Sequence, residues 1–184
     1  SAYACEPNRG SEPGFGWNWA LHLVQEGHDV VLMTSPHGRS AIQRQIALNG
    51  KSQSLNVIYV DVPGWAKRFL KGQVGVIAHY YLWQKSVLKA AKGLIKNIDI
   101  IHHVTWGSIK GGSDLWRLQK PFVFGPIGGG QLAPPGFSSI FGRGYLLEQI
   151  RTFYTKNILP INPFTKSLMR NTALVLFNNK ETLL

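Results

Sequence analysis

The stretch that decides the fold is PGFGWNWALHLVQEGHDVVLMT, residues 13–34. Apolar residues in its first part recur at i, i+3, i+4 and i+7: Trp17, Ala20, Leu21 and Val24. This spacing predicts a helix that begins at Pro13 or Phe15 and ends before a left-handed cap at Gly27. The continuous apolar run within residues 28–34 predicts a strand buried on both faces. A helix followed by a buried strand is the repeating unit of α/β proteins.

The same alternation continues along the chain. Residues 1–4 are typical of the tail of a strand, and further strands are expected at 55–60, 98–105, 121–124 and 173–177. Further helices are expected at 40–48, 80–97, 113–118, 143–156 and 163–170, with a loop or short irregular helix at 63–75. This order predicts one α/β domain over residues 1–184, a Rossmann-like parallel sheet with helices on both faces.

Length and composition limit the class of protein. A chain of 184 residues with 44% hydrophobic content supports one sizeable core and is short for two full domains. We expect it to be an excised part of a longer protein. A single cysteine, Cys5, excludes an internal disulfide framework and a cysteine-rich zinc site. No apolar run reaches about 18 residues and no signal-peptide pattern opens the chain, so a cytoplasmic setting is expected.

The formal net charge of +11 is the strongest anomaly in the composition. A balance this basic favours an anionic partner, either nucleic acid, phospholipid headgroups or a phosphorylated ligand. The alternative is a solvated basic surface. No zinc, recognition-helix or aromatic-sheet signature for nucleic acid is found, so no nucleic-acid partner is expected.

Ligands of parallel sheets bind outside the carboxyl ends of the strands, and three loops stand out there. The first, residues 5–16, is rich in glycine and leads into a helix, where Gly14, Phe15 and Gly16 would let backbone N–H groups approach a phosphate. It is not a dinucleotide fingerprint, because Trp19 stands where glycine or alanine is needed. It is not a P-loop either, because no Gly-Lys-Ser/Thr follows.

The second loop, residues 102–112, follows two adjacent histidines. His102 and His103 point to opposite faces of a strand, so only one readily faces a cleft, and imidazole can act there as acid or base. Two histidines without a third ligand are weak grounds for zinc, and no metal is expected. The third loop, residues 125–136, carries Gly128, Gly129 and Gly130 between stiffening prolines, which favours close approach to a ligand or a facing domain.

A basic stripe is expected on the helix at 80–97. Four lysines recur there at i, i+4, i+7 and i+11: Lys85, Lys89, Lys92 and Lys96. Together with the apolar and basic segment 65–71, the stripe suits contact with anionic lipid headgroups, as a peripheral protein at the inner face of a membrane. The alternative is an ordinary solvated face.

Residues 1–20, Asp99-Ile-Ile-His102 and residues 121–130 together resemble family-4 retaining glycosyltransferases, in the family's order and over nearly the whole chain. The resemblance implies the N-terminal, acceptor-side domain of a GT-B enzyme. It implies a nucleotide sugar shared with a C-terminal domain, a saccharide or lipid-linked acceptor, and no cofactor or catalytic metal.

By matching position, Gly14 and Gly16 would lie near the donor phosphates and Glu12 beside the acceptor. Many relatives carry the active-site histidine where this chain has Val104, which leaves His102 and His103 both open. The family's pair of donor-binding glutamates does not occur, so this domain alone is expected to be inactive. The alternative is a non-catalytic domain that binds an anionic ligand or a membrane surface.

Overall fold

The computed structural model describes residues 1–49, 54–67, 72–134, 136 and 138–183. Its strands are all parallel and form two small sheets. In one sheet β1 (Val30–Thr34) pairs with β2 (Leu55–Tyr59). In the other, β4 (Phe122–Ile127) lies between β3 (Ile101–His103) and β5 (Leu174–Phe177).

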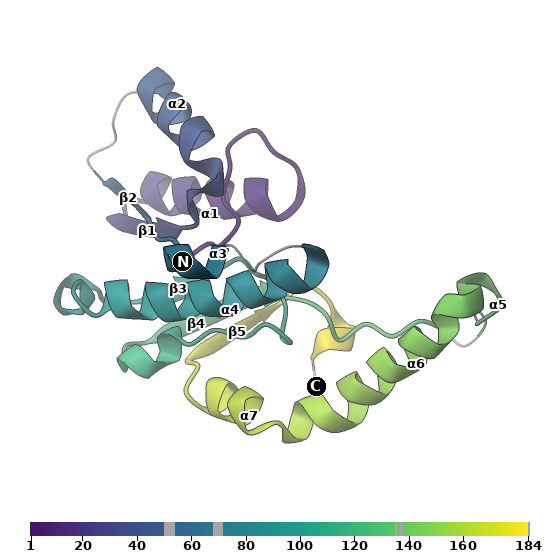
Figure 1. Ribbon diagram of the computed structural model, residues 1–184. Helices are drawn as coiled ribbons and strands as arrows, with labels where there is room; N and C mark the ends of the chain where they lie inside the picture. The colour runs from purple at the N-terminus through teal and green to yellow at the C-terminus, as the bar shows by residue number, and fades with distance from the viewer. Residues whose placement is uncertain (50–53, 68–71, 135, 137, 184) are drawn as a thin grey trace.

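The first residues of the chain join the two sheets. Ala2 forms parallel bridges to Thr34 at the end of β1 and to Thr105 after β3. The Ala2 nitrogen donates to the Met33 oxygen (2.9 Å), and the Tyr3 nitrogen donates to the Thr105 oxygen (2.7 Å). The expected strand tail is therefore confirmed, and it lies between β1 and β3, as Figure 1 shows at the label N.

Helices cover both faces of this arrangement (Figure 1). The helices α1 (Ser11–Gln25) and α2 (Arg39–Asn49) pack on one face, and α4 (Gly72–Ala91) and α7 (Pro163–Arg170) on the other. One core contains Trp17, Ala20, Leu32 and Ile42, and the other contains Met33, Tyr80, Trp83, Phe122, Phe124 and Leu168. The expected α/β class is thus confirmed, and the arrangement is compatible with a Rossmann-like fold.

Short helical segments complete the described chain. They are η1 (Pro36–Gly38), α3 (Gly64–Lys67), η2 (Ile95–Asn97), η3 (Leu115–Leu118), α5 (Ser138–Phe141), η5 (Gly142–Gly144), α6 (Tyr145–Phe153), η6 (Tyr154–Ile158), η7 (Leu159–Ile161) and η8 (Lys180–Thr182). Within the described ranges, no helix has the length and apolar character needed to cross a membrane.

The helix expected at residues 80–97 has different bounds. It begins earlier, at Gly72, and it ends at Ala91, because the chain tightens into a turn where Gly93 N donates to the Ala90 oxygen (3.3 Å). A separate 3₁₀ turn, η2, follows. The four lysines expected on one helix are therefore divided: only Lys85 and Lys89 belong to α4.

Candidate functional site at the carboxyl ends of the strands

Three loops meet at the carboxyl ends of the strands, around Gly107. The Glu12 carboxylate, in the first turn of α1, accepts a hydrogen bond from Gly107 N at 2.6 Å. The Gly107 oxygen accepts from Gly128 N at 2.9 Å, and Ile109 N donates to the Gly128 oxygen at 3.1 Å. Glu12 and the loop of Gly128 are thus both held against Gly107.

The glycines of the third loop have two different surroundings. A methyl group on Gly128 would lie 3.6 Å from Asn178 Nδ2, and 3.9 Å from both Asn179 Nδ2 and Gln131 Nε2. A methyl group on Gly130 would instead meet the Thr182 backbone at 2.6 Å. Gly128 therefore lies next to a group of side-chain amides, whereas Gly130 packs against η8.

Gly129 adds a constraint on the loop itself. Its φ of +98° lies in the region that favours glycine, and a methyl group there would come within 3.2 Å of Ser108 Oγ. The Gly129 nitrogen donates to Gln131 Oε1 at 3.0 Å. The third loop is thus held in a defined shape by its own polar contacts.

Charged groups border the same loops. Burial, followed by the nearby Arg151 guanidinium, lowers the pKa of Lys110. Arg151 in turn forms an ion pair with Glu148, whose Oε1 also accepts from Ala133 N at 3.4 Å. The edge of the sheet at the carboxyl ends of the strands, called here the carboxyl edge, therefore combines carboxylates, cations and neutral amides. Such side chains commonly bind polar ligands in protein sites.

The glycines of the first loop face the chain rather than open space. A methyl group on Gly14 would lie 1.8 Å from the Arg9 oxygen, and one on Gly16 would lie 2.4 Å from the Ala4 oxygen. Both residues are buried, whereas Phe15 between them is 39% exposed. Close packing of α1 on its own preceding loop accounts for these glycines, a reason different from the expected approach of a phosphate.

His102 and His103 point to opposite faces, as expected, and their hydrogen bonds do not involve Glu12, Gly107 or Gly128. His102 lies on the α1 side, where Nδ1 accepts from Trp19 Nε1 (3.2 Å) and Nε2 approaches the Gly125 oxygen (2.7 Å). Since a carbonyl can only accept, Nε2 carries the proton. Burial lowers the pKa of His102 to about 4 and keeps the ring neutral at physiological pH.

His103 lies in the core on the α4 side and has no exposed surface. Its Nδ1 contacts Ser1 Oγ (3.2 Å) and its Nε2 contacts the Tyr80 hydroxyl (3.0 Å). Because that hydroxyl donates to the Gly112 oxygen, we assign the ring proton to Nε2. Burial lowers the pKa of His103 well below its usual value. This placement favours a structural role for His103.

The lysines expected to form one stripe differ in their surroundings. Lys85 Nζ lies 2.6 Å from the buried Asp114 carboxylate, which also holds Arg117 Nε at 3.0 Å. Lys89, Lys92 and Lys96 are exposed, on α4, the following turn and η2 respectively. Of segment 65–71, Trp65 is 69% exposed, and residues 68–71 lie outside the described residues.

Residues that the sequence interpretation did not single out are Ser108, Asn178 and Asn179. The signal for the asparagines was available, since they follow the last strand directly and so had to lie at its carboxyl end. In the described parts of the chain, no three His, Cys, Asp or Glu side chains are grouped to hold a metal ion. Comparison with protein-family models, with curated proteins and with solved structures found no match to this chain.

Proposed function

We propose that this domain is the N-terminal, acceptor-side domain of a retaining glycosyltransferase of the GT-B type. Such an enzyme transfers a sugar from a nucleotide-sugar donor to a saccharide or lipid-linked acceptor. The observation that carries the proposal is the junction at Gly107, which holds the Glu12 carboxylate and the Gly128 loop together at the carboxyl ends of parallel strands. The family resemblance of residues 1–20 and 121–130 supports the same assignment.

The chemistry of this junction suits a sugar. Sugar hydroxyls both donate and accept hydrogen bonds, so a carboxylate and side-chain amides can bind neighbouring hydroxyls. Glu12 supplies an acceptor beside Gly107, and Asn178 and Gln131 supply amide groups beside Gly128. Glu12 orients the acceptor in this proposal, and the nucleotide sugar is held jointly with a second domain.

Because that second domain would hold most of the donor, the test for residues 1–184 is binding and not turnover. We expect no sugar transfer from UDP-, GDP- or ADP-sugars. Calorimetric titration with a panel of short oligosaccharides and these nucleotide sugars should reveal a binder. Glu12→Ala should weaken its affinity at least about tenfold, the loss of one hydrogen bond to a charged group.

Glu26→Ala is the matched control, because Glu26 is an exposed glutamate just after the other end of α1. Its affinity for the same ligand should equal that of the wild type. Equal losses in both variants, or no binding by any member of the panel, would contradict the proposal.

A second candidate function is docking on an anionic membrane surface. The observations that favour it are the exposed Lys89, Lys92 and Lys96 and the net charge of +11. Lys85 is left out of this surface because its ammonium group is engaged by Asp114. Such docking would bring a lipid-linked acceptor to the domain and is compatible with the first proposal.

A further inference from the structure

The helix α6 turns an apolar face toward solvent. The residues of this face, called here the α6 apolar face, recur at i, i+1, i+4 and i+7: Leu146, Leu147, Ile150 and Phe153. They are 58–71% exposed, and Figure 1 shows α6 in green, extending away from the two sheets. A surface helix normally directs such a face toward the core, so a face turned outward favours a binding partner.

The polar side of α6 is the side that meets the rest of the domain. Glu148 Oε1 accepts from Ala133 N of the third loop at 3.4 Å, and Arg151 Nε donates to Glu148 Oε2 at 2.7 Å. Thr155, whose hydroxyl donates to the Arg151 oxygen, is buried. These polar contacts orient α6 and leave its apolar face outward.

Two cations lie where the second loop approaches α6. Lys110 is three residues beyond Gly107, and the Arg151 guanidinium is close enough to contribute, after burial, to the lowered pKa of Lys110. Glu148 is the single acidic residue in the sequence of residues 136–170, and its charge is matched by Arg151. An anionic group beside Lys110 and Arg151 would therefore form charge-assisted hydrogen bonds.

Three kinds of chemistry thus follow one another from the Gly107 junction to α6. The junction offers a carboxylate and amides for sugar hydroxyls, the two cations suit a phosphate, and the α6 apolar face suits a hydrocarbon chain. The second loop leads from Gly107 to Lys110, and the third leads from Gly128 to Ala133 and its bond with Glu148. A saccharide joined through phosphate to a hydrocarbon chain has its groups in the same order.

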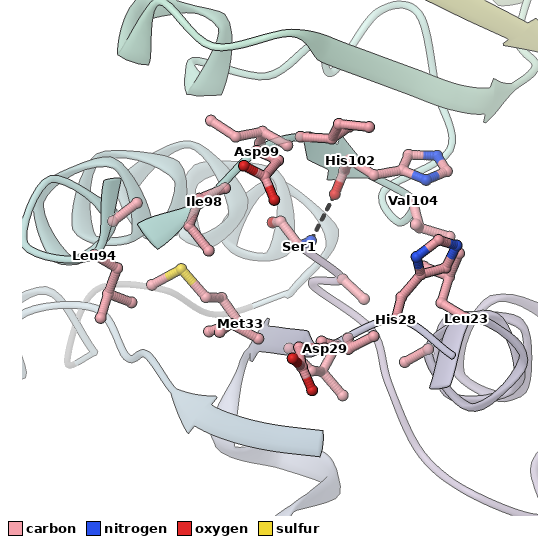
Figure 2. A pocket seen from close by; sticks show the side chains of 18 of the residues that line it. Ser1, Leu23, His28, Asp29, Met33, Leu94, Ile98, Asp99, His102 and Val104 are labelled. Atoms are coloured by element: carbon pink, nitrogen blue, oxygen red, sulfur yellow. Dashed lines mark hydrogen bonds between the residues drawn. The ribbon is translucent and has the colours of Figure 1, made fainter. Parts of the chain in front are cut away.

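The cavity between β1 and β3 is not a rival site for such a chain. It has a volume of about 530 Å³, and Figure 2 shows Asp29 and Asp99 beside it. These residues precede β1 and β3, so the cavity reaches the amino ends of the strands, whereas Gly107 follows β3. Its lining, among the described residues, includes neither Lys110 nor any residue of α6.

We propose that the α6 apolar face and Lys110 bind the lipid part of the acceptor, with a phosphate at Lys110 and Arg151 and a hydrocarbon chain along α6. This inference rests on the proposed function, because it names the acceptor as a saccharide linked through phosphate to a hydrocarbon chain. A second copy of this chain is a less suitable occupant of the face, because two copies with a net charge of +11 repel each other.

Decyl phosphate, which carries no sugar, is the probe for this site. The α6 apolar face is about 10 Å long at 1.5 Å per residue, and a decyl chain has a comparable length. Ethyl phosphate supplies the headgroup alone, and hexaethylene glycol monodecyl ether supplies the chain without a charge. Binding of each compound to residues 1–184 is followed by ¹⁵N–¹H NMR at concentrations below micelle formation.

Two variants separate the contributions of the chain and the charge. Leu147→Ser changes the α6 apolar face, and Leu48→Ser, at an equally exposed leucine of α2, is its control. Lys110→Gln removes the cation, and Lys166→Gln, at an exposed lysine of α7, is its control.

We expect decyl phosphate to shift the amides of Lys110, Leu147 and Ile150, and to bind at least about tenfold more tightly than either partial compound. Leu147→Ser and Lys110→Gln should each weaken its binding at least about fivefold, and the two controls should bind it like the wild type.

Absence of decyl phosphate binding, equal losses in test and control variants, or equal binding of the uncharged ether would overturn the proposal. Dimerisation that Leu147→Ser abolishes, without binding of the probe, would identify a second copy as the occupant and overturn it too. Because no probe carries a sugar, any of these results leaves the oligosaccharide test of the Gly107 junction unaffected.

Discussion

Glu12 Oε1 accepts the hydrogen bond of Gly107 N at 2.6 Å, although the two residues are 95 positions apart in the sequence. This bond connects the first turn of α1 to the loop after β3. Because Gly107 also bonds Gly128, a single carboxylate helps to position the second and third loops together. The contact thus links the stability of the carboxyl edge to its proposed binding chemistry.

Loss of that carboxylate should destabilise the fold. Glu12→Ala leaves the Gly107 N–H without its acceptor, and hydrogen bonds to charged groups contribute about 1.5–3 kcal/mol. Urea denaturation should therefore show a loss of this size, and Glu12→Gln, which keeps an oxygen acceptor, should lose less. Equal stability of Glu12→Ala and the wild type would show that the bond contributes nothing measurable.

Gly16, in the first loop, should be required for packing. Gly16→Ala places a methyl group 2.4 Å from the Ala4 oxygen, and overpacking of this kind costs about 1–3 kcal/mol. We expect Tm to fall by on the order of 5 °C. Gly64→Ala is the control, because no atom lies within 4 Å of a methyl group there and alanine is favourable within a helix, so its Tm should not fall. Equal melting of the two variants would contradict this account.

Helices whose ends carry recognisable capping residues could be predicted from the sequence. The expected bounds of α7, Pro163–Arg170, are those observed, because Asn162 accepts from Phe164 N and Thr165 N as an N-cap. Gly27 adopts the expected left-handed conformation, with a φ of +88°. The bounds of α4 could not be predicted in the same way. The glycines near its start argue against a helix there, whereas the lysine spacing suggested that the helix continues past Ala91.

Acid should weaken the fold through His102. The unfolded ring binds a proton below a pH of about 6.5, whereas the folded ring stays neutral down to its lowered pKa of about 4. The unfolded state therefore binds more protons across this window, and stability falls as the pH falls from 7 to 4. The difference in pKa corresponds to on the order of 3 kcal/mol.

His102→Gln tests this assignment, since the amide side chain can bond but does not titrate. Urea midpoints at pH 7 and pH 4 should differ less in the variant than in the wild type. The lowered pKa of the buried Ser1 amine adds acid destabilisation between pH 8 and 5 in both proteins, and so cancels in the comparison. An identical pH dependence in the two proteins would show that His102 does not titrate in this way.

Membrane docking should depend on the positions of the lysines and not only on their charge. Lys89, Lys92 and Lys96 each contribute on the order of 1 kcal/mol near an anionic surface, and salt weakens the attraction. Changing all three to Gln should reduce co-sedimentation with anionic vesicles at low salt. The matched control changes the exposed Lys156, Lys166 and Lys180 to Gln, with the same loss of charge. Equal reductions would indicate a general charge effect and no docking surface.

The carboxyl edge was only partly predictable. The β-α order was sufficient to bring the loops of Glu12, Gly107 and Gly128 to one edge of the sheet. A glycine pattern does not distinguish approach to a ligand from approach to the chain's own backbone, and Gly14 and Gly16 make the second kind of contact. The pairing of residues 1–3 between β1 and β3 is long-range and has no local signal beyond an apolar start.

The most direct test of the central claim is the location of sugar-induced changes in a ¹⁵N–¹H NMR titration of residues 1–184. A short oligosaccharide or nucleotide sugar that binds should shift the amides of Gly107, Gly128, Gly129 and Gln131, and Glu12→Ala should raise the ligand concentration needed for half of the shift at least about tenfold. Shifts confined to residues remote from the carboxyl ends of the strands, or none for any ligand of the panel, would contradict a sugar site at the carboxyl edge.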